Sequence, residues 1–391
     1  MKTITTSAAL AELCQDFAAS PYITVDTEFL RERTYWSKLC LVQIARPGSD
    51  DDDAVLIDPL ADGIDLQPLF DLMANDDVIK VFHAARQDVE IFWHMGKVIP
   101  TPLFDTQVGA MVCGYGEQVG YETLVRKVVR QSIDKSSRFT DWSRRPLTEK
   151  QQTYALADVT HLRGIYESLR DQIEAANRMH WVAEEMGVLI DPETYNADPE
   201  NAWRRVKART TTPRFLGIVR ALAKWREATA QSRDVPRTRI MKDDALLEIA
   251  TARPKTIDDL GKLRLMQREA RKPEASAQIV EAVAEGLACP NAQLPSLPPP
   301  PKRKEGSGAI AELLRVFLKA RADEVGVAAR LIAPTSDLDA LAGEDAPDLP
   351  VLKGWRREVF GRDALRIKAG EVGLVAQPDG VRLFELVSET A

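Results

Sequence analysis

The feature that most constrains this chain is a pair of carboxylates inside an apparent core strand. Residues 22–29, YITVDTEF, alternate in the manner of a buried strand, yet Asp26 and Glu28 interrupt the pattern. Side chains two residues apart on a strand point to the same face. Because like charges repel and burial disfavours the charged carboxylate, this pair requires a compensating partner.

The surrounding sequence is typical of a mixed α/β domain. Runs rich in Val, Ile, Leu and aromatic residues predict strands at Tyr22–Phe29, Lys38–Ile44, Ala54–Ile57 and Val78–Phe82. Helices are expected after His83, after Phe104, and from Leu147 or Thr148 to about Ala176. Several strands followed by helices predict a sheet with helices packed around it.

Two more acids belong to elements that can meet this strand. Asp88 lies at the start of a helix in HAARQDVEIF, and Asp158 lies inside the long helix in QQTYALADVTHL. Tyr154 precedes Asp158 by one helical turn, so the two share a face. Hard divalent cations such as Mg²⁺ or Mn²⁺ take oxygen ligands and offset the repulsion among carboxylates. Two such ions can hold a phosphodiester and activate a water, which the Tyr154 phenol can orient.

The three acidic motifs, VDTEF, HAARQDVEIF and YALADVTHL, resemble those of the bacterial ribonuclease D group within the DEDD superfamily of 3′-5′ exonucleases. The stretch DKSSRFTDWSRRPLT before the third motif is similar to one in that group. The resemblance implies a ribonuclease H-like sheet and a water-positioning role for Tyr154. It implies metal-ligand roles for Asp26, Glu28, Asp88 and Asp158. The superfamily's other branch has a histidine five residues before the last aspartate, and Thr153 stands there, so the tyrosine branch is implied.

Bulk composition narrows the class of protein. A chain of 391 residues that is 45% hydrophobic and 28% charged suits a soluble globular protein of two or three domains. No stretch approaches the roughly 20 apolar residues that a membrane span needs, and the N-terminus lacks a signal-peptide pattern, so a cytoplasmic location is expected. The four cysteines form no C-x-x-C pair, which argues against a zinc ribbon or a disulfide framework.

Proline and glycine divide the chain. The stretch LPSLPPPPKRKEGSG predicts a linker, and DPETYNADPEN marks a softer break. LAKWREATA followed by PRTRIMKDDALLEIA resembles the HRDC domain, a small helical nucleic-acid-binding module, and VLKGWRREVFG resembles the end of a second, divergent copy. We therefore expect an exonuclease domain over 1–190, an all-α HRDC domain over 199–288, a linker over 289–308 and an all-α HRDC-like domain over 309–391.

Charge is distributed unevenly along the chain. The formal net charge is −7, yet eleven Lys or Arg stand between Trp203 and Ile240 against two acids. Lys and Arg contacts to phosphates give sequence-independent affinity, although a solvated helical face is the alternative reading. The candidate RNA contacts in this segment are Arg204, Arg205, Lys207 and Arg226. Nearer the acids, His83 is a candidate substrate contact, with a structural role as the alternative. Gln43 and Arg31 are candidate contacts either to the substrate or to the residues that hold the metal.

Three functions compete. The leading interpretation is a metal-dependent 3′-5′ exoribonuclease that releases nucleoside 5′-monophosphates from RNA with a single-stranded 3′ end; the resemblance implies tRNA precursors as substrates. A DNA-directed 3′-5′ exonuclease in repair is the second. A non-catalytic RNA-binding scaffold is the third, and a missing carboxylate would be its signature. The sequence has no G-x-x-x-x-G-K-[ST] loop, so no ATP requirement is expected.

Overall fold

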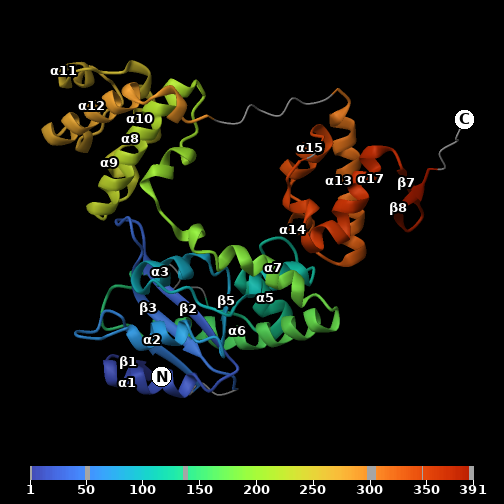
Figure 1. The fold of residues 1–391 in the computed structure, drawn as a ribbon. Coiled ribbons are helices and arrows are strands. Elements are labelled where there is room, and N and C mark those ends of the chain that lie inside the picture. The colour runs from blue at the N-terminus through green and yellow to red at the C-terminus, as the bar shows by residue number, and fades with distance from the viewer. Residues whose placement is uncertain (1, 49–52, 135–139, 297–304, 346, 387–391) are drawn as a thin grey trace, which may run out of the picture.

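The computed structural model shows an N-terminal α/β body followed by two helical bodies (Figure 1). It describes residues 2–48, 53–134, 140–296, 305–345 and 347–386. Residues 135–139 of the stretch before the third motif and residues 297–304 of the predicted linker lie outside the described residues. None of the described helices has the length and apolar character of a membrane-crossing segment.

Six strands form a mixed sheet in the order β1-β4-β3-β2-β5-β6. They are β1 (Lys2–Ile4), β2 (Tyr22–Leu30), β3 (Lys38–Ala45), β4 (Ala54–Ile57), β5 (Ile79–Phe82) and β6 (Leu103–Asp105). β3 is antiparallel to β2 and β4, whereas the β1–β4, β2–β5 and β5–β6 pairs are parallel. The predicted α/β class and its four predicted strands are confirmed. The two edge strands were not predicted, because three residues are too few for alternation to be read.

The helices of this body cover both faces of the sheet. They are α1 (Ser7–Phe17), α2 (Gln67–Met73), α3 (Arg86–Gly96), α4 (Thr106–Val112), α5 (Tyr121–Leu124), α6 (Glu149–Ala175) and α7 (Met179–Leu189), with a π-helical segment at Val125–Val129. A capping box between Thr148 and Gln151 fixes the start of α6. This helix lies across β2, β3 and β4, and the buried Thr24 hydroxyl donates to the Val159 carbonyl at 2.8 Å. This hydrogen bond therefore joins β2, which carries Asp26 and Glu28, to α6, which carries Asp158.

The first helical body has its own hydrophobic core. Two 3₁₀ segments, Pro192–Tyr195 and Pro199–Arg205, lead into α8 (Pro213–Ser232), α9 (Arg237–Ile240), α10 (Asp243–Ala252), α11 (Ile257–Gly261) and α12 (Pro273–Ala288), with 3₁₀ turns at Glu269–Arg271 and Asn291–Gln293. The apolar residues at helical spacing in α8, such as Phe215, Val219 and Leu222, pack into that core.

The second helical body ends in a β-hairpin. Its helices are α13 (Ser307–Val325), α14 (Ala329–Ile332), α15 (Thr335–Gly343), α16 (Gly354–Arg356) and α17 (Arg362–Ala369), with a 3₁₀ turn at Pro350–Leu352 and a π-helical segment at Arg357–Gly361. Strands β7 (Val372–Gln377) and β8 (Gly380–Glu385) then pair antiparallel. The expectation that 309–391 is all-α was wrong for this hairpin, which turns at Pro378 and Asp379, and Gly380, the first residue of β8, has a φ of +145°.

This second body packs directly on the α/β body. The Trp355 ring stacks on Trp181 of α7 with centroids 4.5 Å apart, and Arg356 forms an ion pair of 2.7 Å with Glu185. Apolar residues of the two bodies belong to one continuous core. The second helical body therefore packs against α7.

Candidate active site

Strand β2 and helix α6 bring three carboxylates together. One ligand oxygen each from Asp26, Glu28 and Asp158 lies within 4.8 Å of the others. β2 presents the first two on one face, and α6 crosses that face with the third. The three residues are partly exposed and line a pocket of about 450 Å³. A set of clustered carboxylate oxygens is the donor set that hard divalent cations prefer, so these residues fit a metal site.

Asp88 adjoins this group from the first turn of α3. Its side chain is buried, and its carboxylate accepts a hydrogen bond of 2.5 Å from the Thr27 hydroxyl, between the two acids of β2. Burial, and then the charge of Asp26, raises the pKa of Asp88 well above its ordinary value. The fourth predicted acid therefore lies beside Asp26, although the group within 4.8 Å consists of the other three.

The Asp105 carboxylate stabilises the turn that leads into α3, the helix that carries Asp88. Its carboxylate accepts from the backbone N–H of Gln107 at 2.8 Å, which caps α4. The same carboxylate accepts from the N–H groups of Ala84 and Ala85 at 2.9 Å each, in the turn just before α3. Asp105 therefore caps α4, and its further bonds fix the start of α3.

In the pocket, the negative charge of one carboxylate disfavours the ionised form of its neighbour. Burial, and then the charge of Asp158, raises the pKa of Asp26 well above its ordinary value, against one backbone hydrogen bond from Thr27 that lowers it. A bound cation would reverse this balance, because it favours the charged form of each carboxylate. Cation binding at this site therefore competes with protons.

Tyr154 lies in the same pocket, one helical turn before Asp158. Its ring centroid is 6.0 Å from that of the buried Trp142, in the described part of the stretch before the third motif. Arg145 anchors this stretch to the sheet through two bonds of 2.6 Å to Asp58 and one of 2.6 Å to the Cys40 carbonyl. Trp142 thus packs beside the Tyr154 ring.

Tyr121 is a residue of the pocket that sequence reasoning missed. Its hydroxyl donates to the carbonyl oxygens of Ala157 and Asp158, at 3.0 Å and 2.8 Å. Burial raises its pKa, and the charges of Asp158 and Asp26 raise it further. No local pattern marks this tyrosine, because its partners lie 36 and 37 residues further along the chain.

The three predicted substrate groups near the acids have different environments. His83 lines the pocket, with Nδ1 3.0 Å from the Thr106 hydroxyl, and burial lowers its pKa. Arg31 is engaged by two hydrogen bonds to Glu90, at 2.8 Å and 3.0 Å, outside the pocket. Gln43 is fully buried under α6, so the structure contradicts its assignment as a substrate contact.

Much of the basic segment is neutralised within the first helical body. Arg226 is 2% exposed and binds the Asp243 carboxylate at 2.6 Å, so its prediction as an RNA contact was wrong. Arg205 lies 3.5 Å from Glu227, with its side chain 46% exposed. Arg204 is exposed beside the Trp203 ring, and Lys207 is exposed.

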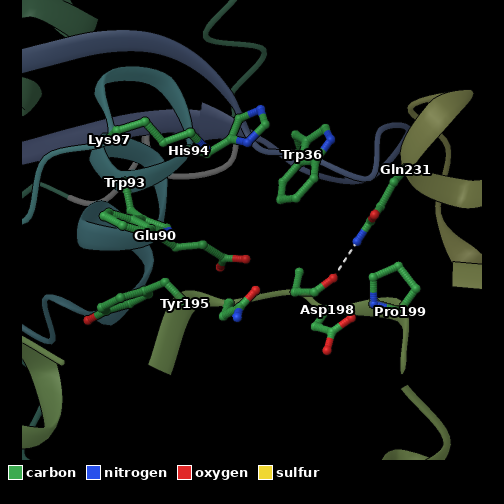
Figure 2. Close-up of a pocket in the computed structure, with 11 residues that line it drawn as sticks. Trp36, Glu90, Trp93, His94, Lys97, Tyr195, Asp198, Pro199 and Gln231 are labelled. Carbon is green, nitrogen blue, oxygen red and sulfur yellow. Dashed lines mark hydrogen bonds between the residues drawn. The ribbon is translucent and has the colours of Figure 1, made fainter. Parts of the chain in front are cut away.

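A second pocket, of about 370 Å³, lies between α3 and the segment that leads into α8. Trp36 stacks on His94 there with ring centroids 3.9 Å apart, and the Gln231 amide donates to a backbone carbonyl of the segment, that of Ala197 (Figure 2). Of the four predicted metal ligands, none lines this pocket. It is therefore distinct from the candidate metal site.

Comparisons with known proteins agree with this geometry. A 3′-5′ exonuclease family model matches residues 1–174, and an HRDC domain model matches residues 215–283. Ribonuclease D of Jannaschia sp. is 55% identical over 98% of this chain and 99% of its own length. Ribonuclease D of Nitrobacter hamburgensis is 48% identical over 96% and 97%.

A solved structure supports the same assignment. The crystal structure of Escherichia coli RNase D, described as an exoribonuclease involved in structured RNA processing, superposes with a TM-score of 0.82 at 29% identity. The match covers 94% of this chain and 98% of that one. The chain therefore belongs to the ribonuclease D family of 3′-5′ exoribonucleases.

Proposed function

We propose that this enzyme removes nucleotides from RNA 3′ ends as nucleoside 5′-monophosphates, with Asp26, Glu28, Asp88 and Asp158 holding two divalent ions, Mg²⁺ or Mn²⁺. The observation that carries the proposal is the convergence of three carboxylates within 4.8 Å, with the fourth beside them. When bound, such ions lower the pKa of an attacking water and stabilise the leaving oxygen.

The chain's own residues have separate tasks in this proposal. The Tyr154 hydroxyl orients the attacking water, because it lines the same pocket as Asp26 and Asp158. The Thr27 hydroxyl holds the carboxylate of Asp88 in one orientation. Positioning and charge stabilisation are most of what phosphoryl transfer needs from a protein. His83 lines the pocket and remains a candidate contact to the terminal nucleotide.

The proposed substrates are RNAs with a single-stranded 3′ end, tRNA precursors among them, and no ATP is required. The relatives named ribonuclease D and the structured-RNA role printed for the Escherichia coli enzyme support this choice over DNA. We propose that residues 1–190 form the exonuclease domain, that 199–288 and 309–391 form HRDC and HRDC-like domains separated by a linker at 289–308, and that the enzyme works in the cytoplasm.

The test is an assay of the purified full chain with a tRNA precursor, a 3′-blocked RNA and single-stranded DNA, each with and without Mn²⁺. The proposal expects Mn²⁺-dependent shortening of the tRNA precursor from its 3′ end, and no reaction on the blocked RNA. Faster cleavage of DNA than of RNA would favour the alternative of a DNA-directed repair exonuclease. Release of internal fragments from the blocked RNA would contradict exonuclease action.

A further inference from the structure

Gln43 is a fully buried amide directly behind the metal site. It lies on β3 opposite Asp26 on β2, and its exposed fraction is 0%. Residues paired across antiparallel strands point to the same face, so its side chain shares the face of Asp26. On this face Leu41 and Leu56 of the sheet pack with Val159 of α6 in an apolar layer. Gln43 is therefore a polar group in an otherwise apolar layer that the pocket does not reach.

Both amide atoms of Gln43 lack a hydrogen-bond partner among the described residues. A buried amide without a partner is costly, so its presence calls for an explanation. Thr24, on the same face of β2 and equally buried, shows the usual solution, because its hydroxyl contacts the carbonyls of Ala45 and Val159. The lack of a hydrogen-bond partner is therefore a property of the Gln43 position and not of buried polar groups on this face in general.

The residue directly opposite Gln43 across the strand pair is Asp26, whose carboxylate can accept a hydrogen bond from this amide. Directly opposed residues have Cβ atoms about 4.5–5.5 Å apart, a gap that a glutamine side chain can bridge. An ionised carboxylate has several lone-pair sites, and cations on the open side of the pocket use some of them. Asp26 already accepts a bond from the backbone N–H of Thr27, and the lone-pair sites that cations leave open can accept a second donor from inside the protein.

We propose that Gln43 is a positioning residue whose Nε2–H group donates to the inward-facing oxygen of Asp26 when the site holds its cations. The inference rests on the proposed metal-binding function and adds a residue that acts through Asp26 without touching RNA. Carboxylates that bind metals are themselves commonly hydrogen-bonded, and loss of such a bond costs about 10–100-fold in metal affinity.

The test compares Mn²⁺ affinity, by calorimetric titration, between the wild-type chain and Gln43→Met. Methionine retains the length of the side chain and suits the apolar layer. Mn²⁺ affinity is expected to fall about 10–100-fold. The melting temperature of the metal-free protein is expected to stay equal or rise, because the substitution removes an unpaired buried amide. A lowered melting temperature with unchanged Mn²⁺ affinity would show a purely structural role and overturn the inference.

Thr24→Val is the matched control. It removes another buried polar group from the same face, one whose bonds go to backbone carbonyls. We expect a lower melting temperature with Mn²⁺ affinity within about twofold of wild type. An equal loss of Mn²⁺ affinity in this control would show that any disturbance beneath α6 weakens the site, and would contradict a specific role of Gln43.

A crystal structure of the wild-type chain with Mn²⁺ tests the contact without any substitution. The inference expects Gln43 Nε2 within hydrogen-bond distance of an Asp26 oxygen, and an amide bound to a buried water instead would overturn it. The proposed function fails separately, if the wild-type chain binds no Mn²⁺. Mn²⁺ binding that is unchanged by Gln43→Met removes the inference and leaves the proposed function standing.

Discussion

The Tyr35 hydroxyl donates a hydrogen bond of 2.5 Å to the carboxylate of Glu227, a residue 192 positions further along the chain. Glu227 belongs to α8 and is fully buried, and Arg205 and Arg237 also approach its carboxylate, at 3.5 Å and 3.3 Å. The backbone N–H groups of Tyr35 and of the next residue both donate to Asp234 at 3.0 Å. These bonds form a clamp between the loop that follows β2 and the first helical body.

Tyr35→Phe is predicted to loosen this clamp. Because the substitution leaves a buried carboxylate with one donor fewer, we expect the free energy of unfolding to fall by about 1–3 kcal/mol. Urea denaturation measures that loss, and limited proteolysis should cut faster between the α/β body and α8. Tyr115→Phe is the control, since that hydroxyl makes only exposed contacts to the Gln172 amide, at 3.2 Å and 3.5 Å. Equal effects of the two variants would show that the clamp contributes nothing specific.

Tyr154→Phe is predicted to lower kcat by about a hundredfold while Mn²⁺ affinity changes little. The phenyl ring retains the packing near Trp142, and the lost hydroxyl removes the group that orients the attacking water. Single-turnover hydrolysis of a short RNA and a Mn²⁺ titration measure the two quantities on the same preparation. If weakened metal affinity proved to be the main effect, the assignment of water positioning would be wrong.

The metal-free protein is predicted to lose stability as pH rises. Burial raises the pKa values of Asp26 and Asp88 above the ordinary value of 3.8, so the folded state binds more protons than the unfolded state above that pH. The free energy of unfolding then falls by up to about 1.4 kcal/mol per pH unit for each group, until pH passes the folded-state pKa. Thermal melts with EDTA at several pH values measure this slope.

Asp26→Asn is the matched variant for that experiment. The amide does not titrate, so the decline of the melting temperature with pH is expected to be shallower than in the wild-type chain. Added Mn²⁺ should stabilise the wild-type chain more at higher pH, where the carboxylates lose their protons. A melting temperature of the metal-free wild-type chain that rises with pH above 4 would contradict the raised pKa values.

Arg226→Met and Lys207→Ala are predicted to separate structure from RNA binding. Arg226 is buried against Asp243, so its loss should lower the melting temperature of the chain. Lys207 is exposed, so its loss should leave folding intact and reduce the salt dependence of RNA binding by about 0.7 in slope, the contribution of one single-strand phosphate contact. Binding titrations at several salt concentrations measure this slope. A slope that Lys207→Ala leaves unchanged would show that Lys207 does not contact RNA.

The acids of the site could be predicted because they violate the rules of a core strand. Two carboxylates at alternate positions in a run of Val, Ile and Thr have no packing explanation, and such local conflicts often mark functional sites. The spacing between Tyr154 and Asp158 likewise follows from helix geometry alone. The placement of β2 and α6 that joins them depends on long-range packing, and the sequence indicates it through family resemblance.

Partners of buried polar groups could not be predicted in this way. Arg226 looks like its exposed neighbours in the sequence, and its burial depends on Asp243 in the next long helix. Gln43 follows the strand alternation, which does not distinguish the pocket from the layer under α6. The hydrogen bond between Tyr35 and Glu227 joins two bodies, and no local sequence pattern predicts which of their residues will meet.

The central claim is that carboxylates from β2, α3 and α6 bind the metal ions that drive hydrolysis of RNA 3′ ends. Its most direct test is hydrolysis of a 5′-labelled RNA by the wild-type chain and by Asp158→Asn, each with Mn²⁺ or with EDTA. The account predicts stepwise 3′ shortening by the wild-type chain with Mn²⁺, and a loss of about 10³-fold or more in the variant or in EDTA. Hydrolysis by Asp158→Asn within about tenfold of wild type, or full activity in EDTA, would contradict it.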